Sequence, residues 1–291
     1  MKNKKLSHNG LQGSVTSVMA ALLCILIGLA VGFLVLLAIN PAHAWADGFV
    51  RILKGGFHDA PYGVGKELAN AAPLIMTGLS VGFAFKTGLF NIGAAGQYTL
   101  GAYGALYCAI MLKLPWFVCL LAAAILGGLW GAIPGFFKAY FNINEVITSI
   151  MFNWIGLYLV NELVYQNGTG PMYDVRNTRT LNLGKNADLA QSVIPDFGLN
   201  KLFQTNSTTI AIFLAAVVAI LIWVVLNKTT FGYELKAVGL NKSAARYAGI
   251  NEKKNIILSM AIAGALAGFG AGLFYLSNVG QWNPLNSTSL P

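Results

Sequence analysis

Seven long apolar stretches constrain this chain more than any other feature of its sequence. A transmembrane helix needs about 20 predominantly apolar residues, and each stretch is close to or beyond that length. Backbone polar groups must be paired in lipid, and continuous hydrophobicity excludes the alternating pattern of barrel strands, so we expect an all-α polytopic integral membrane protein. The predicted spans are Val15–Ile39, Leu68–Phe85, Phe90–Leu112, Leu114–Phe137, Val146–Val164, Thr208–Leu226 and Asn255–Leu276.

Composition agrees with a membrane protein. Hydrophobic residues make up 56% of the 291 residues and charged residues 10%, whereas a soluble domain carries about 25% charged residues. Cys24, Cys108 and Cys119 lie inside apolar stretches and form no CxxC pair. We therefore predict no disulfide framework, metal site or cofactor.

The lysine-rich N-terminus predicts the orientation of the chain. Cytoplasmic segments of membrane proteins carry an excess of Lys and Arg. If the N-terminal tail at 1–14 is cytoplasmic, eleven of the 19 Lys and Arg residues of this chain lie on the inner side. We expect one transmembrane domain over 1–291, with outer segments at 40–67 and 165–207 and a cytoplasmic loop at 228–254. The net charge of +9 then marks the cytoplasmic face, and we predict no nucleic-acid partner.

The basic loop at 228–254 contains signals for a compact, capped surface. We expect two short helical pieces separated by Gly239. Asn241 is a good N-cap for the second piece, Lys242–Ala248, and Gly249 stands where a left-handed residue ends a helix. The predicted knob has an alanine face with two basic residues at its rim: Ala244, Ala245, Ala248, Lys242 and Arg246.

A glycine-rich segment joins the second and third spans with almost no polar loop. Its five glycines predict a helix broken near Phe90–Gly96, with Asn91 and Gln97 as uncharged hydrogen-bonding side chains. Irregular backbone at membrane depth lines a cavity or is buried in protein, and broken helices mark substrate paths in transporters. The alternative is a tight turn at the cytoplasmic surface with a packing face.

The fifth span carries a second candidate for the substrate pathway. Asn153 and Asn161 are eight residues apart and share one helix face, and Trp154 and Tyr158 share an adjacent face. Amides beside aromatic rings suit a neutral, planar or hydroxylated ligand, since no Asp, Arg or Lys lies near the midplane. Helix packing with ordinary core aromatics is the alternative.

Glycines also recur every four residues in two of the predicted spans. Such faces allow helix backbones to approach closely in a membrane. We interpret them as intramolecular packing faces of a tight bundle, formed by Gly127, Gly131, Gly135, Gly264, Gly268 and Gly272.

Several catalytic motifs are missing from the sequence. It contains no GxxxxGK[ST] loop, HExxH or GxSxG, so we predict neither ATP binding by a P-loop nor an enzyme. An ATP-independent secondary transporter or channel is the alternative of another class, although intramembrane ionisable groups and an inverted repeat are not evident. A membrane enzyme or an assembly scaffold is a third reading.

Three motifs, in order, resemble the permease subunits of bacterial ABC importers for branched-chain amino acids and simple sugars, with the nucleoside-importer branch most similar. They are GLSVGFAFKTGLFNIGAAGQYTLGA (78–102), NEVITSIMFNWIGLYLVN (144–161) and FGYELKAVGLNKSAARYAGI (231–250). The resemblance implies a translocation subunit for a small neutral solute such as a nucleoside, or alternatively for simple sugars or branched-chain amino acids.

The resemblance also implies partners and a location in the bacterial inner membrane, surrounded by lipid. A second permease, commonly a different chain, pairs with such a subunit, two cytoplasmic ATPases dock beneath, and an extracytoplasmic binding protein or lipoprotein delivers the ligand. Gly239–Ile250 would then carry the coupling helix that contacts the ATPase. Family members continue with further spans beyond the one containing Gly264–Gly272, so we expect a chain truncated at its C-terminus relative to the family.

Overall fold

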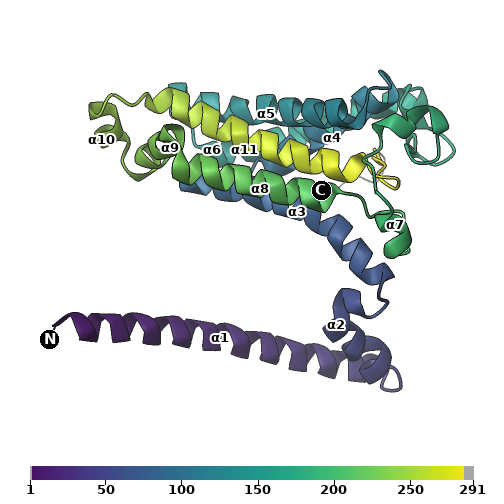
Figure 1. Cartoon of the computed structure of the whole chain (residues 1–291), viewed down its shortest axis with the longest axis horizontal. Helices are drawn as coiled ribbons and strands as arrows, with labels where there is room; N and C mark the ends of the chain where they lie inside the picture. Colours follow the sequence, from purple (N-terminus) through teal and green to yellow (C-terminus); the bar gives the residue numbers. More distant parts are fainter. Residues whose placement is uncertain (1, 285–291) are drawn as a thin grey trace. The chain divides into compact units, whose positions relative to one another are not determined.

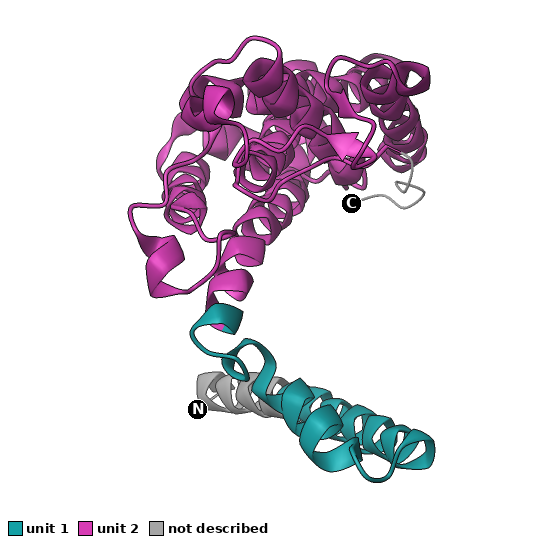
Figure 2. Ribbon diagram, turned by 90° about the vertical axis from the view of Figure 1, so that its right-hand side faces the viewer, with its two compact units in different colours: residues 1–63 teal, residues 64–291 magenta. Residues whose placement is uncertain are grey.

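This computed structural model describes the backbone of residues 2–284 and the side chains of residues 16 and 18–284. The chain divides into two compact units, one ending at Gly63 and one beginning at Val64, shown in different colours in Figure 2. Each unit is described by itself.

The first unit contains one long helix and a short helical region after it. Helix α1 (Lys2–Ile39) includes the apolar stretch Val18–Ile39, which is long enough to span a membrane. It is followed by a π-helical segment η1 (Ala44–Phe49), α2 (Val50–Lys54) and a 3₁₀ turn η2 (Gly55–Phe57). The Phe33 ring of α1 contacts the rings of Trp45 and Phe49, with centroids 5.7 and 4.9 Å apart. These ring contacts hold the short helical region against the end of α1.

The second unit is a bundle of long helices lying roughly side by side (Figure 1). Two short helices, α9 and α10, lie at one end of the bundle, and the 165–207 segment lies at the other. The helices are α3 (Tyr62–Lys86), α4 (Ala94–Ile110), α5 (Trp116–Phe141), α6 (Glu145–Tyr165), α8 (Ala211–Lys228), α9 (Thr230–Leu240), α10 (Lys242–Tyr247) and α11 (Glu252–Tyr275).

A helix occurs at each of the seven predicted spans, but one is shorter than expected. Within the described residues, six helices are long and apolar enough to cross a membrane. The predicted span Phe90–Leu112 is helical only as α4, Ala94–Ile110, which has 17 residues. The backbone is irregular from Thr87 to Gly93, where the chain connects α3 to α4, so this segment is a non-helical connection and not a break within one helix. The all-α polytopic fold is confirmed.

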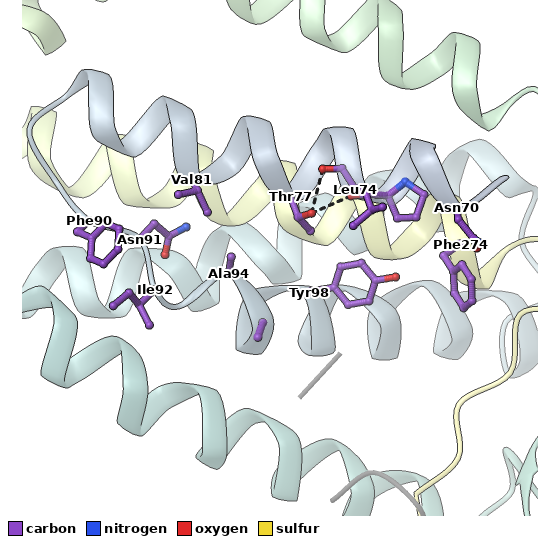
Figure 3. Close-up of a pocket in the computed structure, with 12 residues that line it drawn as sticks. Asn70, Leu74, Thr77, Val81, Phe90, Asn91, Ile92, Ala94, Tyr98 and Phe274 are labelled. Atoms are coloured by element: carbon purple, nitrogen blue, oxygen red, sulfur yellow. Dashed lines mark hydrogen bonds between the residues drawn. The ribbon is translucent and has the colours of Figure 1, made fainter. Parts of the chain in front are cut away.

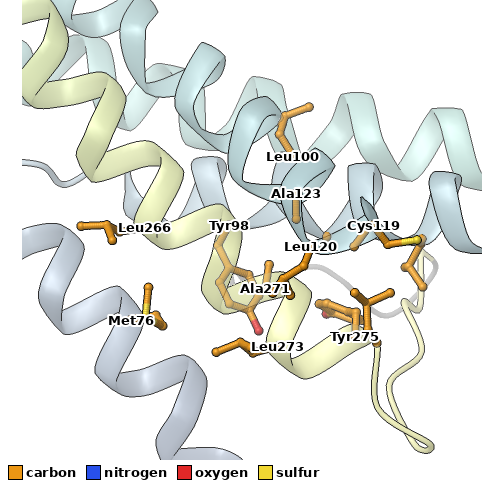
Figure 4. Close-up of a cluster of buried hydrophobic side chains, with 14 of the residues drawn as sticks. Met76, Tyr98, Leu100, Cys119, Leu120, Ala123, Leu266, Ala271, Leu273 and Tyr275 are labelled. Carbon is orange, nitrogen blue, oxygen red and sulfur yellow. The ribbon is translucent and has the colours of Figure 1, made fainter. Parts of the chain in front are cut away.

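Helix α11 forms the centre of the bundle by packing closely on α5 and α4. A Cβ atom at Gly268 would lie 2.3 Å from the Ala123 carbonyl oxygen, and one at Gly264 would lie 2.3 Å from the Gly127 carbonyl oxygen. Real Cβ atoms do not approach this closely, so the glycine repeats are packing faces within the chain, as predicted. Figure 4 shows part of the buried apolar cluster around this contact, including Leu120, Ala123 and Ala271.

The 165–207 segment is folded over one end of the bundle. It contains a 3₁₀ turn η3 (Gln166–Gly168), a two-stranded antiparallel ladder of β1 (Tyr173–Asp174) and β2 (Arg179–Thr180), the 3₁₀ segment η4 (Ala187–Ser192) and α7 (Leu199–Leu202). Hydrogen bonds from Thr180 N to Trp282 O and from Ile194 N to Leu276 O, both 2.9 Å, join it to the chain after α11. The buried side chains of Met172, Leu183, Leu189 and Ile194 give it an apolar core.

Candidate functional site

The break between α3 and α4 is a buried, irregular segment in the bundle. Gly88 has φ of +73°, a left-handed conformation that glycine adopts without strain. The Leu89 N–H donates to the Ala84 carbonyl at 3.0 Å, which closes the end of α3. Thr87, Leu89 and Asn91 are buried, and Asn91 is only 1% exposed. This polar backbone therefore needs hydrogen-bond partners inside the protein.

Two amide side chains from the predicted pathway hold this segment together. Asn91 Nδ2 donates to Gln97 Oε1 at 2.8 Å, and Gln97 Nε2 donates to Asn91 Oδ1 at 3.0 Å. Asn91 Nδ2 also donates to Ser80 Oγ on α3 at 3.1 Å. The reciprocal pair ties the irregular segment to the first turn of α4 and to α3.

Asn153 braces the same break from α6. Its Oδ1 accepts from the Gly96 N–H at 2.8 Å, and its Nδ2 donates to the Ile92 carbonyl at 2.9 Å. A Cβ atom at Gly96 would lie 2.8 Å from Asn153 Cα, so α4 and α6 meet there backbone to backbone. Asn153 thus satisfies one of the N–H groups that the start of α4 leaves without an intrahelical partner.

The structure therefore brings together three of the six residues that we predicted for the substrate pathway. The side chains of Asn91, Gln97 and Asn153 form hydrogen bonds with other groups of the protein. Their geometry fixes the shape of the break, and only Asn91 also lines a cavity.

The broken segment forms one wall of a cavity of about 750 Å³. Figure 3 shows α3 on one side of the space and α4 on the other, with Phe90, Asn91 and Ile92 at one end and Asn70 and Phe274 toward the other. Among the described lining residues none is charged, and most are apolar. Such a space suits an uncharged solute that presents both apolar faces and polar groups.

Three polar residues of this cavity were not predicted from the sequence: Asn70, Thr77 and Tyr98. The Thr77 hydroxyl donates to the Pro73 and Leu74 carbonyls, at 3.0 and 3.1 Å, which leaves its oxygen free to accept. Asn70 and Thr77 are seven residues apart on α3, a spacing that puts both on one helix face. That spacing is the signal that sequence reasoning overlooked.

The remaining predicted pathway residues lie away from this cavity. Trp154 and Tyr158 are 41% and 66% exposed on α6, where their rings stack with centroids 6.1 Å apart. Asn161 Oδ1 accepts from Trp282 Nε1 at 2.9 Å, which anchors the chain after α11. The structure does not bring Trp154, Tyr158 or Asn161 to the broken segment.

The predicted capped helix is present as α10. Asn241 caps α10 by accepting from the Ala244 N–H at 3.0 Å. Gly249 has φ of +80°, and the Ile250 N–H donates back to the Ala245 carbonyl at 3.0 Å, so α10 ends in a left-handed glycine as predicted. The boundary before α10 was wrong, because Gly239 lies inside α9 and Asn241 separates the two helices.

The exposed surface of α10 differs from the predicted alanine face. Ala245 is 3% exposed and faces the protein, so its placement on the outer face was wrong. Lys242, Ala244 and Arg246 are exposed as expected. Leu240 and Tyr247, which we did not predict, are 88% and 94% exposed. We call Leu240, Lys242, Ala244, Arg246 and Tyr247 the α10 surface.

The broken segment and the α9–α10 region are in direct contact. Gly88 and Gly239 approach each other through their backbones. The Thr87 hydroxyl is hydrogen-bonded to the Ser259 hydroxyl of α11. One end of the break therefore contacts α9 next to α10, and the other end lines the cavity.

Metal chemistry has no evident place in this arrangement. Within the part of the chain that the structure describes, no three His, Cys, Asp or Glu side chains converge to hold a metal ion. The arrangement offers a cavity, an irregular segment that shapes it, and α9, which contacts that segment and leads into the exposed α10.

Membrane-spanning helices that line an uncharged cavity define the class, a polytopic membrane protein. Residues 65–290 match the family described as the permease component of the branched-chain amino acid transport system, and the chain belongs to this family. It is accordingly a multi-pass membrane component of a transport system.

Several curated proteins are similar to this chain over most of its length. The guanosine ABC transporter permease protein NupP of Bacillus subtilis is 34% identical over 280 residues, which cover 93% of this chain and 72% of NupP. The nucleoside ABC transporter permease protein NupB of Lactococcus lactis is 32% identical, over 90% of this chain and 72% of NupB. The glucose ABC transporter permease protein TsgB13 of Haloferax volcanii is 35% identical, over 85% of this chain and 65% of TsgB13. No solved structure matches.

Proposed function

We propose that this permease carries nucleosides across the membrane through the cavity between α3 and α4. The observation that supports this most is the character of that cavity, whose described lining is uncharged and presents Asn70, Thr77 and Tyr98 among apolar and aromatic side chains. A nucleoside is uncharged, has a flat ring and carries hydroxyl groups, so it matches such a lining. Two of the relatives named above are described as guanosine or nucleoside permeases.

Uptake measurements with matched tyrosine variants test this pathway. Tyr98→Phe removes one hydroxyl from the cavity, whereas Tyr103→Phe removes one from a tyrosine of α4 that is not among the lining residues. A hydrogen bond to an uncharged group is worth about 0.5–1.5 kcal/mol. We expect Tyr98→Phe to raise the KM for labelled guanosine by about three- to tenfold and Tyr103→Phe to leave it unchanged. Equal KM values for the two variants would show that the pathway does not pass Tyr98.

A sugar is the second candidate substrate, because TsgB13 is described as a glucose permease. Competition distinguishes the two solutes. Cells expressing the permease with its partner subunits take up labelled guanosine, and unlabelled uridine or glucose is added in excess. Loss of guanosine uptake with uridine alone supports the nucleoside, and uptake of labelled glucose that uridine does not inhibit supports the sugar.

We further propose that an ATPase subunit in the cytoplasm drives this permease by binding the α10 surface. Tyr247 and Leu240 offer large apolar groups at the tip, and Lys242 and Arg246 add positive charge beside them. Tyr and Arg are the residue types that contribute most to protein interfaces. The absence of a P-loop from the sequence agrees with a separate source of energy.

Co-purification with the ATPase tests the α10 surface. We expect Tyr247→Ala with Arg246→Glu to abolish the association. Arg176→Glu is the matched control, since Arg176 is exposed in the 165–207 segment at the opposite end of the bundle. Association that survives the double variant would rule out the α10 surface as the docking site.

The same proposal fixes the orientation, with the N-terminus and α10 in the cytoplasm of a bacterial cell and the 165–207 segment outside. A membrane-impermeant thiol reagent tests it on Ser243→Cys and Lys185→Cys in a background without native cysteines. We expect intact cells to label the variant at 185 only. We propose that a second permease subunit and an extracytoplasmic binding protein complete the importer; the description of two relatives as guanosine ABC transporter permease proteins agrees with a multi-subunit transporter.

A further inference from the structure

A second cavity, of about 660 Å³, opens at the end of the bundle that carries α9 and α10. It lies between α3, α8 and α9 and shares none of its lining residues with the first cavity. Its interior is apolar and is formed mainly by the facing surfaces of two membrane-spanning helices. These lining residues are Leu79, Phe83, Ala219, Ile222 and Leu226.

Positive charge borders this apolar space. Lys86, at the end of α3, and Lys236, within α9, both line the cavity. Lys228 ends α8, with its Nζ 5.9 Å from the centre of the Trp223 ring, which is itself a lining residue. Among the described residues, no carboxylate forms a salt bridge with Lys86, Lys228 or Lys236. These cations are therefore not neutralised within the part of the chain described.

The hydrogen bond that Lys236 makes does not supply negative charge. Lys236 Nζ donates to the amide oxygen of Asn227 at 2.9 Å. The acid of α9, Glu234, instead accepts from Asn255 of α11 at 3.2 Å. A cation at the end of a helix interacts favourably with the helix dipole, which accounts for Lys86 and Lys228. It does not account for Lys236, which is placed inside α9 and still lines the cavity.

The position of the cavity matches the boundary between hydrocarbon and headgroups. Helices α3 and α8 both end beside it, with lysines as their last residues. Tryptophan is enriched at this level of a membrane, and Trp223 stands one turn from the end of α8. An occupant would meet apolar helix surfaces on one side and ammonium groups on the other.

We propose that this cavity binds an anionic phospholipid of the cytoplasmic leaflet. An acyl chain lies between α3 and α8, and the phosphate lies between Lys86 and Lys236. Basic pockets between transmembrane helices on the cytoplasmic side bind anionic headgroups. The assignment to the cytoplasmic leaflet rests on the orientation proposed above, whereas binding itself does not depend on transport or on the ATPase.

The site also has a consequence for the mechanism. Gly88 and Gly239, the two residues through which the broken segment contacts α9, both line this cavity. A bound lipid therefore contacts the junction between the cavity-lining break and the proposed ATPase-docking region. The anionic-lipid content of the membrane would thus affect how ATP hydrolysis is coupled to uptake.

Native mass spectrometry of the purified chain, titrated with phosphatidylglycerol or phosphatidylcholine, tests the site. We expect phosphatidylglycerol to bind more tightly. Lys86→Gln with Lys236→Gln should weaken it by roughly 30-fold, since each lysine near an anionic surface contributes about 1 kcal/mol. Lys253→Gln with Lys254→Gln removes the same charge from the start of α11, outside this cavity, and should change little. Equal affinity for the two lipids, or equal losses in both double variants, would overturn the proposal.

A second variant tests the apolar half of the site. Ala219→Trp fills the space between α3 and α8 without changing charge. We expect it to lower phosphatidylglycerol binding at least tenfold while circular dichroism and monodispersity stay unchanged. Retained binding in this variant would show that the lipid binds elsewhere. If cysteines introduced at 86 and 236 cross-link to a second permease, the occupant of the cavity is a protein and not a lipid. Lipid binding is measured without transport, so a loss of nucleoside uptake in any of these variants does not alter the conclusion about binding.

Discussion

Gly88 and Gly239 meet backbone to backbone, although they are far apart in the sequence. A Cβ atom at Gly88 would lie 2.7 Å from Gly239 Cα, and one at Gly239 would lie 2.7 Å from the Thr87 carbonyl carbon and 2.8 Å from Gly88 N. Neither neighbour is a flexible side chain, so a methyl group at either position must displace the main chain. The contact joins the irregular segment to α9, the helix that precedes α10. A shift of α9 is therefore expected to move the wall of the cavity.

The first prediction concerns Gly239→Ala. Alanine is favoured over glycine in a helix by about 1 kcal/mol, but here it displaces backbone, and overpacking costs about 1–3 kcal/mol. We expect nucleoside uptake to fall at least tenfold while the ATPase still co-purifies. Gly78→Ala is the control, since nothing lies within 4 Å of the Cβ position there. Uptake at the normal rate in Gly239→Ala would show that this contact does not matter for coupling.

The second prediction concerns the brace that Asn153 provides. Asn153→Ala leaves the Gly96 N–H and the Ile92 carbonyl without their side-chain partner in a buried site. An unsatisfied buried group costs about 1–3 kcal/mol. We expect a clear fall in the Tm of the purified protein in detergent, together with reduced uptake.

Two further variants make this test specific. Asn153→Asp keeps the acceptor for the Gly96 N–H and loses only the donor to the Ile92 carbonyl. Its Tm should be lowered by the loss of that one hydrogen bond and by the burial of a negative charge. Asn177→Ala removes an exposed amide that donates to Asp174 at 2.6 Å and should change the Tm little. A Tm for Asn153→Ala equal to that of Asn177→Ala would contradict the bracing role.

The third prediction concerns the glycine contact between α5 and α11. Gly268→Leu places a branched side chain where even a Cβ atom would lie 2.3 Å from the Ala123 carbonyl oxygen. Because both partners at the contact are backbone, the helices must separate, and we expect a loss beyond about 3 kcal/mol and little folded protein in the membrane. Gly28→Leu lies on α1 with nothing within 4 Å and should accumulate normally. Normal accumulation of Gly268→Leu would disprove the close packing.

Sequence reasoning succeeded where the signal is local. The apolar runs, the glycine repeats and the caps of α10 at Asn241 and Gly249 all depend on residues near in sequence, and the structure confirms them. The glycine run before α4 likewise predicted irregular backbone, which the structure has from Thr87 to Gly93 as the connection between α3 and α4.

The failures have different physical causes, and the first is that a membrane helix is surrounded by apolar material on every side. Trp154 and Tyr158 are apolar enough for either lipid or core, so the sequence does not reveal which they face. Ala245 lies in a helix of six residues, too short for periodicity to show which side is buried. Gly239 was predicted to separate two helices. It instead lies inside α9, where the absence of a side chain allows its backbone to contact Gly88, and this contact is evident only in the folded chain.

The last prediction concerns the ion pair that links the ends of α5 and α6. Lys138 Nζ lies 2.9 Å from Glu145 Oε2, and the two side chains are 17% and 15% exposed. Glu145→Gln leaves the Lys138 charge partly buried without its partner, which we expect to cost about 1–3 kcal/mol, seen as a lower Tm. Removing both charges with Lys138→Met and Glu145→Leu should recover part of that loss, because replacing a buried pair by apolar groups is often neutral. Additive losses in the double variant would show that the pair is not coupled.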